Sequence, residues 1–228
     1  YGSVLVDGHD TCEVSLTDIS QIVGSVLQDI DTQMVASVVE DEMLFGLENF
    51  GVPHDQIEQR LCETLKTVGI SDLRDREIAT LSGGQKQKVA IAAILAMRPR
   101  VLVLDEPTAA LDPASSTLVF ETLREANRAL GITIVVVEQK VALLSEYCNR
   151  VLVLDHGQIA LQGEPHEVFA RTDELRTIGV DCPRVTRIFN SLEADGLVSG
   201  TPCLDVDEAE RLITEIVDPD RATSDTQA

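Results

Sequence analysis

Two acids, Asp105 and Glu106, stand directly after an apolar run of β-forming residues, Val101 to Leu104. This order predicts a buried parallel strand that delivers its acids to the carboxyl edge of a sheet. Open α/β folds bind their ligands at that edge. The pair therefore marks a candidate ligand site whose chemistry is carried by carboxylates.

A second candidate lies upstream, where Ser82, Gly83 and Gly84 form a small-residue turn before a helix-like run. The first amide groups of a helix have no partner within the helix, and the positive end of the helix dipole lies there. Such a helix start favours an anion. A third piece, Ala-Leu-Asp-Pro at 110–113, predicts a turn just beyond the sheet edge.

The three pieces follow in order: Leu-Ser-Gly-Gly-Gln at 81–85, Leu-Asp-Glu-Pro at 104–107 and Leu-Asp at 111–112. In sequence and spacing they resemble the nucleotide-binding subunits of ABC transporters. The alternative is a generic doubly wound α/β protein that contains a Ser-Gly-Gly by chance. The agreement of three ordered elements favours the ABC resemblance.

The resemblance implies an α/β fold of the P-loop NTPase (RecA-like) type. We expect the ATPase domain over residues 1–170, with an inserted helical subdomain over about 37–97, and a small C-terminal extension over 171–228. The phosphate loop of this fold reads G-x-x-x-x-G-K-[ST], and no Gly-Lys-Ser or Gly-Lys-Thr occurs in the chain. We therefore expect a core that lacks its first strand and phosphate loop, in a chain that begins inside the domain and is inactive alone.

The resemblance also assigns catalytic roles for ATP hydrolysis. Asp105 would serve Mg²⁺, Glu106 would polarise the attacking water as general base, and Gln28 would sense the metal and the γ-phosphate. Gln28 ends the strand predicted at 22–28. The alternatives are a structural network of paired carboxylates and a solvent-facing glutamine at a strand end.

A further set of residues would serve a nucleotide shared between two subunits. In the family, the helix start caps the γ-phosphate of the nucleotide held by the opposite subunit, and Asp112 lies in the loop that links the two sites. The resemblance thus implies these cofactor-binding residues: Ser82, Gly83, Gly84, Gln85 and Asp112.

One position departs from the family pattern. The strand predicted at Thr133–Val137 ends in Glu138-Gln139-Lys140, and Gln139 stands where the family usually has a histidine that contacts the γ-phosphate. Glutamine can donate a hydrogen bond, but it has no proton or charge to transfer. Gln139 is therefore a third catalytic candidate, in a site whose full turnover rate is in question.

The stretch from Asp31 to Asn49 resembles the energy-coupling-factor and cobalt-type branch of the family. In that branch the region forms a groove that docks a helix of the transmembrane coupling subunit, here near Phe45–Asn49. The alternative is that Phe45 and Leu47 are core residues. The branch implies an ATP- and Mg²⁺-dependent subunit of an importer for a vitamin or a transition-metal ion, peripheral on the cytoplasmic face of the membrane. It would pair with a second ABC ATPase domain as a homodimer, a heterodimer or a tandem half.

Composition limits the other functions. The net charge of −21 argues against binding to nucleic acid, and no apolar run approaches the roughly eighteen residues that a membrane-spanning helix needs. The first residues contain no basic and apolar signal region. Five widely spaced cysteines without a C-x-x-C predict reduced, buried thiols, and four scattered histidines show no metal-ligand spacing.

Two rival functions remain open. One is a soluble ABC ATPase of translation or repair, which the acidic charge and the stretch at 45–49 disfavour. The other is a non-hydrolysing module that only completes a partner's nucleotide site, which the missing phosphate loop and Gln139 support. The C-terminal extension is expected to pack on the core, with a dimerising or regulatory role as the alternative.

Hydrophobic periodicity supplies the remaining elements. We expect helices at 82–97, 114–130, 185–192 and 207–217, a hairpin at 151–162, and a polar tail at 218–228. The helix at 114–130 would turn Leu118, Leu123, Ala126 and Leu130 inward, and the β-branched strand at 133–137 would be buried.

Overall fold

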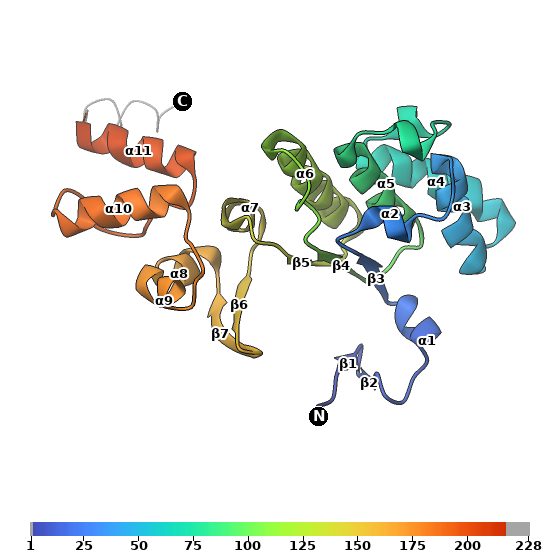
Figure 1. The fold of residues 1–228 in the computed structure, drawn as a ribbon, viewed down its shortest axis with the longest axis horizontal. Helices are drawn as coiled ribbons and strands as arrows, with labels where there is room; N and C mark the ends of the chain where they lie inside the picture. Colours follow the sequence, from blue (N-terminus) through green and yellow to red (C-terminus); the bar gives the residue numbers. More distant parts are fainter. Residues whose placement is uncertain (1, 218–228) are drawn as a thin grey trace. The chain divides into compact units, whose positions relative to one another are not determined.

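The structure is a computed structural model of the chain that describes residues 2–217, so the polar tail predicted at 218–228 lies outside the described residues. Its contacts divide the chain into two compact units, Tyr1–Gln139 and Lys140–Ala228 (Figure 1). The first unit contains all of the predicted site residues.

A three-stranded parallel sheet organises the first unit. Strands β3 (Val23–Val26), β4 (Val101–Asp105) and β5 (Thr133–Val137) lie side by side in the order β3-β4-β5 (Figure 1). The register pairs Val26 with Leu104, and Asp105 with Val137. All three carboxyl ends therefore meet at one edge, as parallel pairing requires. β3 ends before the predicted boundary at Gln28, so Gln28 follows the strand rather than closing it.

Helices pack with this sheet in the first unit. They are α2 (Ile30–Gln33), α3 (Val39–Asn49), α4 (His54–Val68), α5 (Gly83–Ala96) and α6 (Pro113–Leu130), with 3-10 turns at Ser71–Leu73 and Ile78–Thr80. Of these, α3, α4 and α5 fall within the range 37–97, where the helical subdomain is predicted. Their shared core is aliphatic and includes Met43, Leu61 and Ile91. Before them stand a hairpin of β1 (Leu5–Val6) and β2 (His9–Asp10) and the short helix α1 (Leu16–Ser20).

Gly24 allows α5 to approach the sheet closely. A Cβ atom at this position would lie 2.2 Å from Cγ2 of Ile94 and 3.3 Å from Cγ of Pro99. No side chain fits in that space, because close packing leaves no slack between strand and helix. Gly24 thus fixes the distance between β3 and the helix that begins at Ser82.

The predicted inward face of α6 is partly wrong. Leu123 and Ala126 are buried, but Leu118 and Leu130 are 51% and 42% exposed. The buried stripe also contains Ser116, Val119 and Phe120. Their spacing places Ser116, Val119 and Phe120 on the same helix face as Leu123 and Ala126. Leu118 is rotated about 100° from Val119 around the helix axis and faces outward.

The prediction that β5 is buried on both faces is also wrong. Val135 and Val137 are 46% and 54% exposed, whereas Ile134 and Val136 pack against the core. Among the described residues β5 pairs only with β4. One face of the strand is therefore covered, and the β-branched run could not reveal which face.

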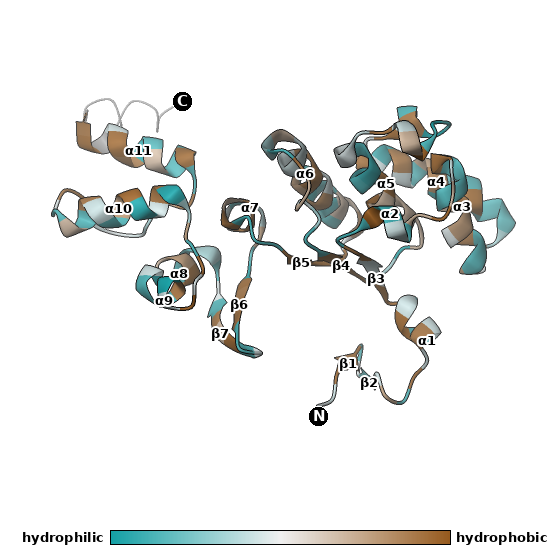
Figure 2. Ribbon diagram, in the orientation of Figure 1, coloured by the Kyte–Doolittle hydropathy of each residue, from teal (hydrophilic) through white to brown (hydrophobic). Residues whose placement is uncertain are grey.

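The second unit has its own hydrophobic core. A hairpin of β6 (Val151–Asp155) and β7 (Gln158–Gly163) turns at His156-Gly157, as predicted. Five helices complete the unit: α7 (Val141–Tyr147), α8 (Pro165–Phe169), α9 (Thr172–Thr177), α10 (Arg184–Ala194) and α11 (Val206–Val217). Figure 2 shows hydrophobic and hydrophilic residues interspersed along α10 and α11, the two helices predicted near the C-terminus.

Residues on both sides of the predicted 170/171 boundary share this core. Val153, Leu161 and Phe169 pack in one cluster with Leu175 and Leu204. The compact units meet at 139/140 instead. The division into an ATPase domain and an extension stays a prediction about sequence domains, and it does not coincide with a gap in packing.

All five cysteines are free, as predicted, but only Cys182 and Cys203 are buried. Cys12 and Cys62 are exposed, so the expectation that every thiol is buried was wrong for these two. Within residues 2–217, none of the helices combines the length and the apolar character that crossing a membrane requires.

Candidate active site

The carboxylate of Glu106 receives a neutral amide on each oxygen. Nε2 of Gln28 donates to Oε2 at 3.0 Å, and Nε2 of Gln139 donates to Oε1 at 2.5 Å. Gln28 follows β3, Glu106 follows β4 and Gln139 follows β5. The structure therefore joins the three predicted catalytic residues into one cluster at the carboxyl edge of the sheet.

The backbone of Glu106 lies in the left-handed region, with φ of 44°. This conformation costs a residue with a Cβ atom about 1–2 kcal/mol. It is stabilised on both sides, because the amide of Glu106 donates to the carbonyl of Val137 at 2.8 Å and the amide of Ala109 donates to the carbonyl of Glu106 at 3.1 Å. Such strain at a functional group is typical of active sites.

Asp105 exposes its side chain at the end of β4, beside the partly buried Glu106. The oxygen ligands offered by Asp105 and by the amide of Gln28 are of the kind that Mg²⁺ prefers. Within the described residues, no group of three or more His, Cys, Asp or Glu side chains could hold a metal by itself. Mg²⁺ that bridges nucleotide phosphates needs only one or two protein carboxylates, so these residues fit that role.

Two supporting residues escaped the sequence analysis. Thr108 is fully buried, and its hydroxyl donates to Oε2 of Glu138 at 2.5 Å. The other carboxylate oxygen of Glu138 accepts from the amide of Gln139 at 2.9 Å. These contacts fix the backbone from which Gln139 reaches Glu106. The one signal in the sequence was the position of Glu138, an acid at a strand end directly before Gln139.

The predicted anion-binding helix start is formed by α5. Ser82 caps it: its hydroxyl accepts from the amide of Gln85 at 3.3 Å, and the side chain of Gln85 accepts from the amide of Ser82 at 3.0 Å. This reciprocal capping box occupies both side chains, and Ser82 and Gly83 remain exposed. The helix start is therefore ordered before any ligand arrives.

Gly83 and Gly84 lie against the turn that carries Asp112. A Cβ atom at Gly83 would stand 3.2 Å from Cδ2 of Leu111, and one at Gly84 would stand 3.2 Å from Cβ of Ser115. A side chain at either glycine would require its neighbour in this turn to shift by a few tenths of an ångström. The two predicted nucleotide-binding segments are thus neighbours within this chain.

Asp112 acts in this structure as the N-cap of α6. Its carboxylate accepts from the amide of Ser115 at 3.0 Å and from the Ser115 hydroxyl at 2.6 Å. The hydroxyl is the main cause that lowers the pKa of Asp112. No hydrogen bond joins Asp112 or the helix start to Glu106 within the described chain. The second group of predicted residues is therefore a separate patch.

The segment after Gln28 is attached to the helical subdomain at two points. Nζ of Lys86, on α5, forms an ion pair with Asp31 at 2.7 Å. The buried Glu42, on α3, accepts through Oε2 from the amides of Val35 at 2.9 Å and Ala36 at 2.8 Å. Lys86 and Glu42 therefore both restrain the segment between Gln28 and α3.

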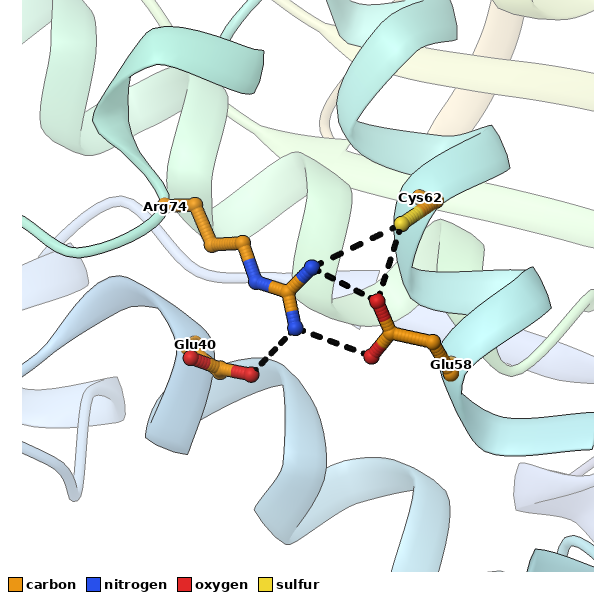
Figure 3. A network of polar contacts seen from close by, with 4 residues as sticks. All are labelled: Glu40, Glu58, Cys62 and Arg74. Carbon is orange, nitrogen blue, oxygen red and sulfur yellow. Dashed lines mark hydrogen bonds and ion pairs between the residues drawn. The ribbon is translucent and has the colours of Figure 1, made fainter. Parts of the chain in front are cut away.

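An ion-pair cluster joins three parts of the helical subdomain. The guanidinium of Arg74 contacts Glu40 of α3 at 2.5 Å and Glu58 of α4 at 2.7 and 2.8 Å (Figure 3). The thiol of Cys62 donates to Glu58 at 3.2 Å. Glu58 and Glu40 raise the pKa of Arg74, and Arg74 lowers the pKa of Glu58.

The predicted docking region divides into core and surface. Leu47 is fully buried and belongs to the core, whereas Phe45 is 53% exposed. Nδ2 of Asn49 donates to the carbonyl of Phe45 at 2.7 Å, within the last turns of α3. Only Phe45 of the two hydrophobic candidates is placed to meet a partner.

Comparison with known proteins identifies the family. Residues 1–109 match the ABC transporter family. The energy-coupling factor transporter ATP-binding protein EcfA1 of Clostridium perfringens is 40% identical over 208 residues, which are 91% of this chain and 74% of that protein. The protein of the same name from Symbiobacterium thermophilum is 44% identical over 210 residues, covering 91% of this chain and 72% of that protein.

A solved structure supports the same assignment. It is CbiO1 from Clostridium perfringens, described as part of the ABC transporter complex cbiONQ. The match has a TM-score of 0.72 at 36% identity and covers 85% of this chain and 76% of that one. This chain therefore has the α/β fold of the P-loop NTPases and belongs to the ABC transporter ATPases, in the branch of the energy-coupling factor ATP-binding proteins.

Proposed function

We propose that this chain, as part of a complete protein, hydrolyses MgATP as the energising subunit of an energy-coupling factor importer for a vitamin or a transition-metal ion. The observation that carries the proposal is the Glu106 cluster at the sheet edge. A carboxylate oriented by two amides can accept a proton from water, because neutral donors align it without cancelling its charge. The names of the relatives support the transport role.

In the proposed reaction Glu106 takes a proton from the attacking water. The resulting oxygen attacks the γ-phosphorus, and ADP leaves with the electron pair of the broken bond. Nε2 of Gln28 donates to Glu106, so the side-chain carbonyl oxygen of Gln28 remains available to the metal or the water. Mg²⁺, held by Asp105 and Gln28 with the phosphates, would offset charge on the phosphates. Gln139 holds Glu106 in the chain alone and could donate to the γ-phosphate once nucleotide binds.

The start of α5 serves a second nucleotide in this proposal. Ser82, Gly83, Gly84 and Gln85 offer exposed or half-exposed groups at the positive end of a 14-residue helix. They would contact the γ-phosphate of ATP on a second ABC ATPase domain, in a homodimer, a heterodimer or a tandem protein. Asp112, beside this helix start, would link the two sites.

The membrane partner is proposed to dock near Phe45–Asn49. The exposed ring of Phe45 offers apolar area on a helix whose other large hydrophobic residues are buried or packed against the core. CbiO1, the solved relative, is described as part of a transporter complex. By this proposal the chain is bound peripherally to the cytoplasmic face of a membrane through a transmembrane coupling subunit.

The test uses the full protein assembled with its membrane subunits in lipid bilayers. We expect ATP hydrolysis that accelerates with transported solute, and we expect Glu106→Gln to abolish turnover while MgATP still binds. Asp105→Asn, which lowers metal affinity, should raise the Mg²⁺ concentration that hydrolysis requires. An assembled wild-type complex that binds ATP without hydrolysing it would overturn the proposal in favour of a binding module.

A further inference from the structure

The outer edge of β3 carries backbone groups that face away from β4. The carbonyl of Ile22 accepts from Arg100 at 2.9 Å and from Val101 at 3.0 Å, so Ile22 faces β4. Because backbone groups alternate in direction along a strand, those of Ser25 and Leu27 face the opposite side. Within the described residues β3 has no strand on that side, and such edge groups need another partner.

The side chain of Gln33 is that partner. Its Oε1 accepts from the amide of Leu27 at 2.9 Å, and its Nε2 donates to the carbonyl of Ser25 at 3.0 Å. A carboxamide has one acceptor and one donor side by side, so it copies a peptide group of a neighbouring strand. Gln33 thereby continues the sheet by one residue pair beyond β3.

This contact closes the loop that begins with Gln28. Leu27 immediately precedes Gln28, and its own side chain is 53% exposed, so packing does little to fix it. Gln33 is the last residue of α2 and is half-buried. The two bonds fix the direction in which the chain leaves β3, and that direction sets where the amide of Gln28 can reach.

We propose that Gln33 is a positioning residue of the hydrolytic site, whose carboxamide holds Ser25 and Leu27 so that Nε2 of Gln28 meets Glu106. The geometry of Gln33 stands independently of activity, whereas its effect on turnover rests on the proposed function. Glu42 restrains the far side of the same segment, at Val35 and Ala36, and does not contact the exit of β3.

The first test replaces the carboxamide at nearly constant length. Gln33→Met removes both hydrogen bonds, and we expect kcat of the assembled complex to fall about tenfold with KM for ATP within about twofold, since the contact of Nε2 of Gln28 with Glu106 serves the attack of water and not the binding of nucleotide. Gln33→Glu keeps the acceptor for Leu27 but opposes a carboxylate to the Ser25 carbonyl, so its kcat should also fall about tenfold.

A matched control is Gln59→Met. Gln59 is an exposed glutamine of α4 whose side chain, among the residues that the structure describes, hydrogen-bonds to Glu63 alone, so this variant should keep wild-type kcat. In a Gln28→Ala background, adding Gln33→Met should lower kcat by less than about twofold, because the residue being positioned is already gone. An additive loss would assign Gln33 a merely structural role and overturn the inference.

Hydrogen exchange tests the geometry without any activity. We expect the amide of Leu27 to exchange at least about tenfold faster in Gln33→Met than in wild type, and the amide of Arg100, bonded to Ile22, to be unchanged. If the wild-type complex does not hydrolyse ATP, the proposed function fails and the exchange result still tests the contact. If the complex hydrolyses ATP and Gln33→Met does so equally well, only this inference fails.

Discussion

Glu106 and Arg74 each stand at the centre of a cluster that joins three segments of the first unit, and the two clusters differ in how their charges are distributed. Glu106 receives two neutral amides, so no cation among the described residues lies against its carboxylate. Arg74 forms ion pairs with two carboxylates, so each of those carboxylates lies against a cation. Both clusters have a net charge of −1, but only the first has its negative charge on a carboxylate without a cationic partner in the described chain, at a sheet edge.

The comparison separates two effects on a carboxylate: its orientation by hydrogen bonds, and the neutralisation of its charge by a cation. A cation beside a carboxylate lowers its pKa and weakens it as a base, and an amide bond does so to a lesser extent. The Arg74 cluster is therefore suited to holding α3, α4 and the turn at residue 74 together. The Glu106 cluster keeps a carboxylate available for chemistry. Four measurements test this contrast, beginning with the largest expected effect.

Placing a cation beside Glu106, as Arg74 lies beside its two carboxylates, should have the largest effect on turnover. Gln139→Arg places a guanidinium beside Glu106, which stabilises the charged carboxylate and weakens it as a general base. We expect kcat of the assembled complex to fall about 100-fold, measured by steady-state hydrolysis. An unchanged kcat would show that neutrality of the partner does not matter.

Removing one amide should cost less. Gln139→Met keeps the approximate size of the side chain but deletes the hydrogen bond to Glu106. We expect kcat to fall about threefold to tenfold, since the Gln28 amide still orients the carboxylate. Steady-state hydrolysis with the assembled complex measures this, and Gln59→Met provides the control. A loss as large as that of Gln139→Arg would mean that orientation, not charge, dominates.

The reverse change weakens the second cluster. Arg74→Gln replaces a guanidinium by an amide and leaves Glu40 and Glu58 without their countercharge. We expect a loss of about 1–2 kcal/mol in the free energy of unfolding, measured by urea denaturation, while KM for ATP changes little. A selective fall in kcat at unaltered stability would contradict the structural role given to this cluster.

The smallest expected effect is on the pH dependence of stability. The hydrogen bonds from Arg74 are the main cause of the lowered pKa of Glu58. A carboxyl group with a lowered folded-state pKa stabilises the fold above its ordinary pKa, and this contribution is lost as the pH falls through the lowered value. Wild type should therefore lose more stability than Arg74→Gln between about pH 5 and 3. Parallel unfolding curves over that range would show that Arg74 does not cause the shift.

The sequence was most informative where strands end. The sheet edge itself pointed to Asp105 and Glu106, and the family resemblance added Gln28 and Gln139. The structure joins Gln28, Glu106 and Gln139 because parallel strands bring their carboxyl ends to one edge. Thr108 and Glu138 could not be predicted, because a supporting hydrogen bond depends on the path of the turn after β4 and not on residue type alone. Arg74 was missed for a related reason: its partners lie on two helices whose packing has to be known first.

Local patterns also left the faces of elements undecided. A run of β-branched residues such as Thr133–Val137 predicts a strand, but which side is covered depends on what packs against the sheet. Leu118 was assigned inward because leucine is apolar. Its position around the axis of α6 instead places it on the face that is exposed to solvent. Gln33 shows the same limit, since a polar residue in a short helix gives no sign that it completes a sheet edge.

The left-handed backbone of Glu106 has a consequence for directed evolution. Glycine and asparagine adopt this conformation more readily than glutamate does, so a library randomised at position 106 and screened for heat resistance alone should be enriched in those residues. The same clones would have lost the carboxylate on which the proposed reaction depends. Screens for durability and for turnover should thus drive this one position in opposite directions.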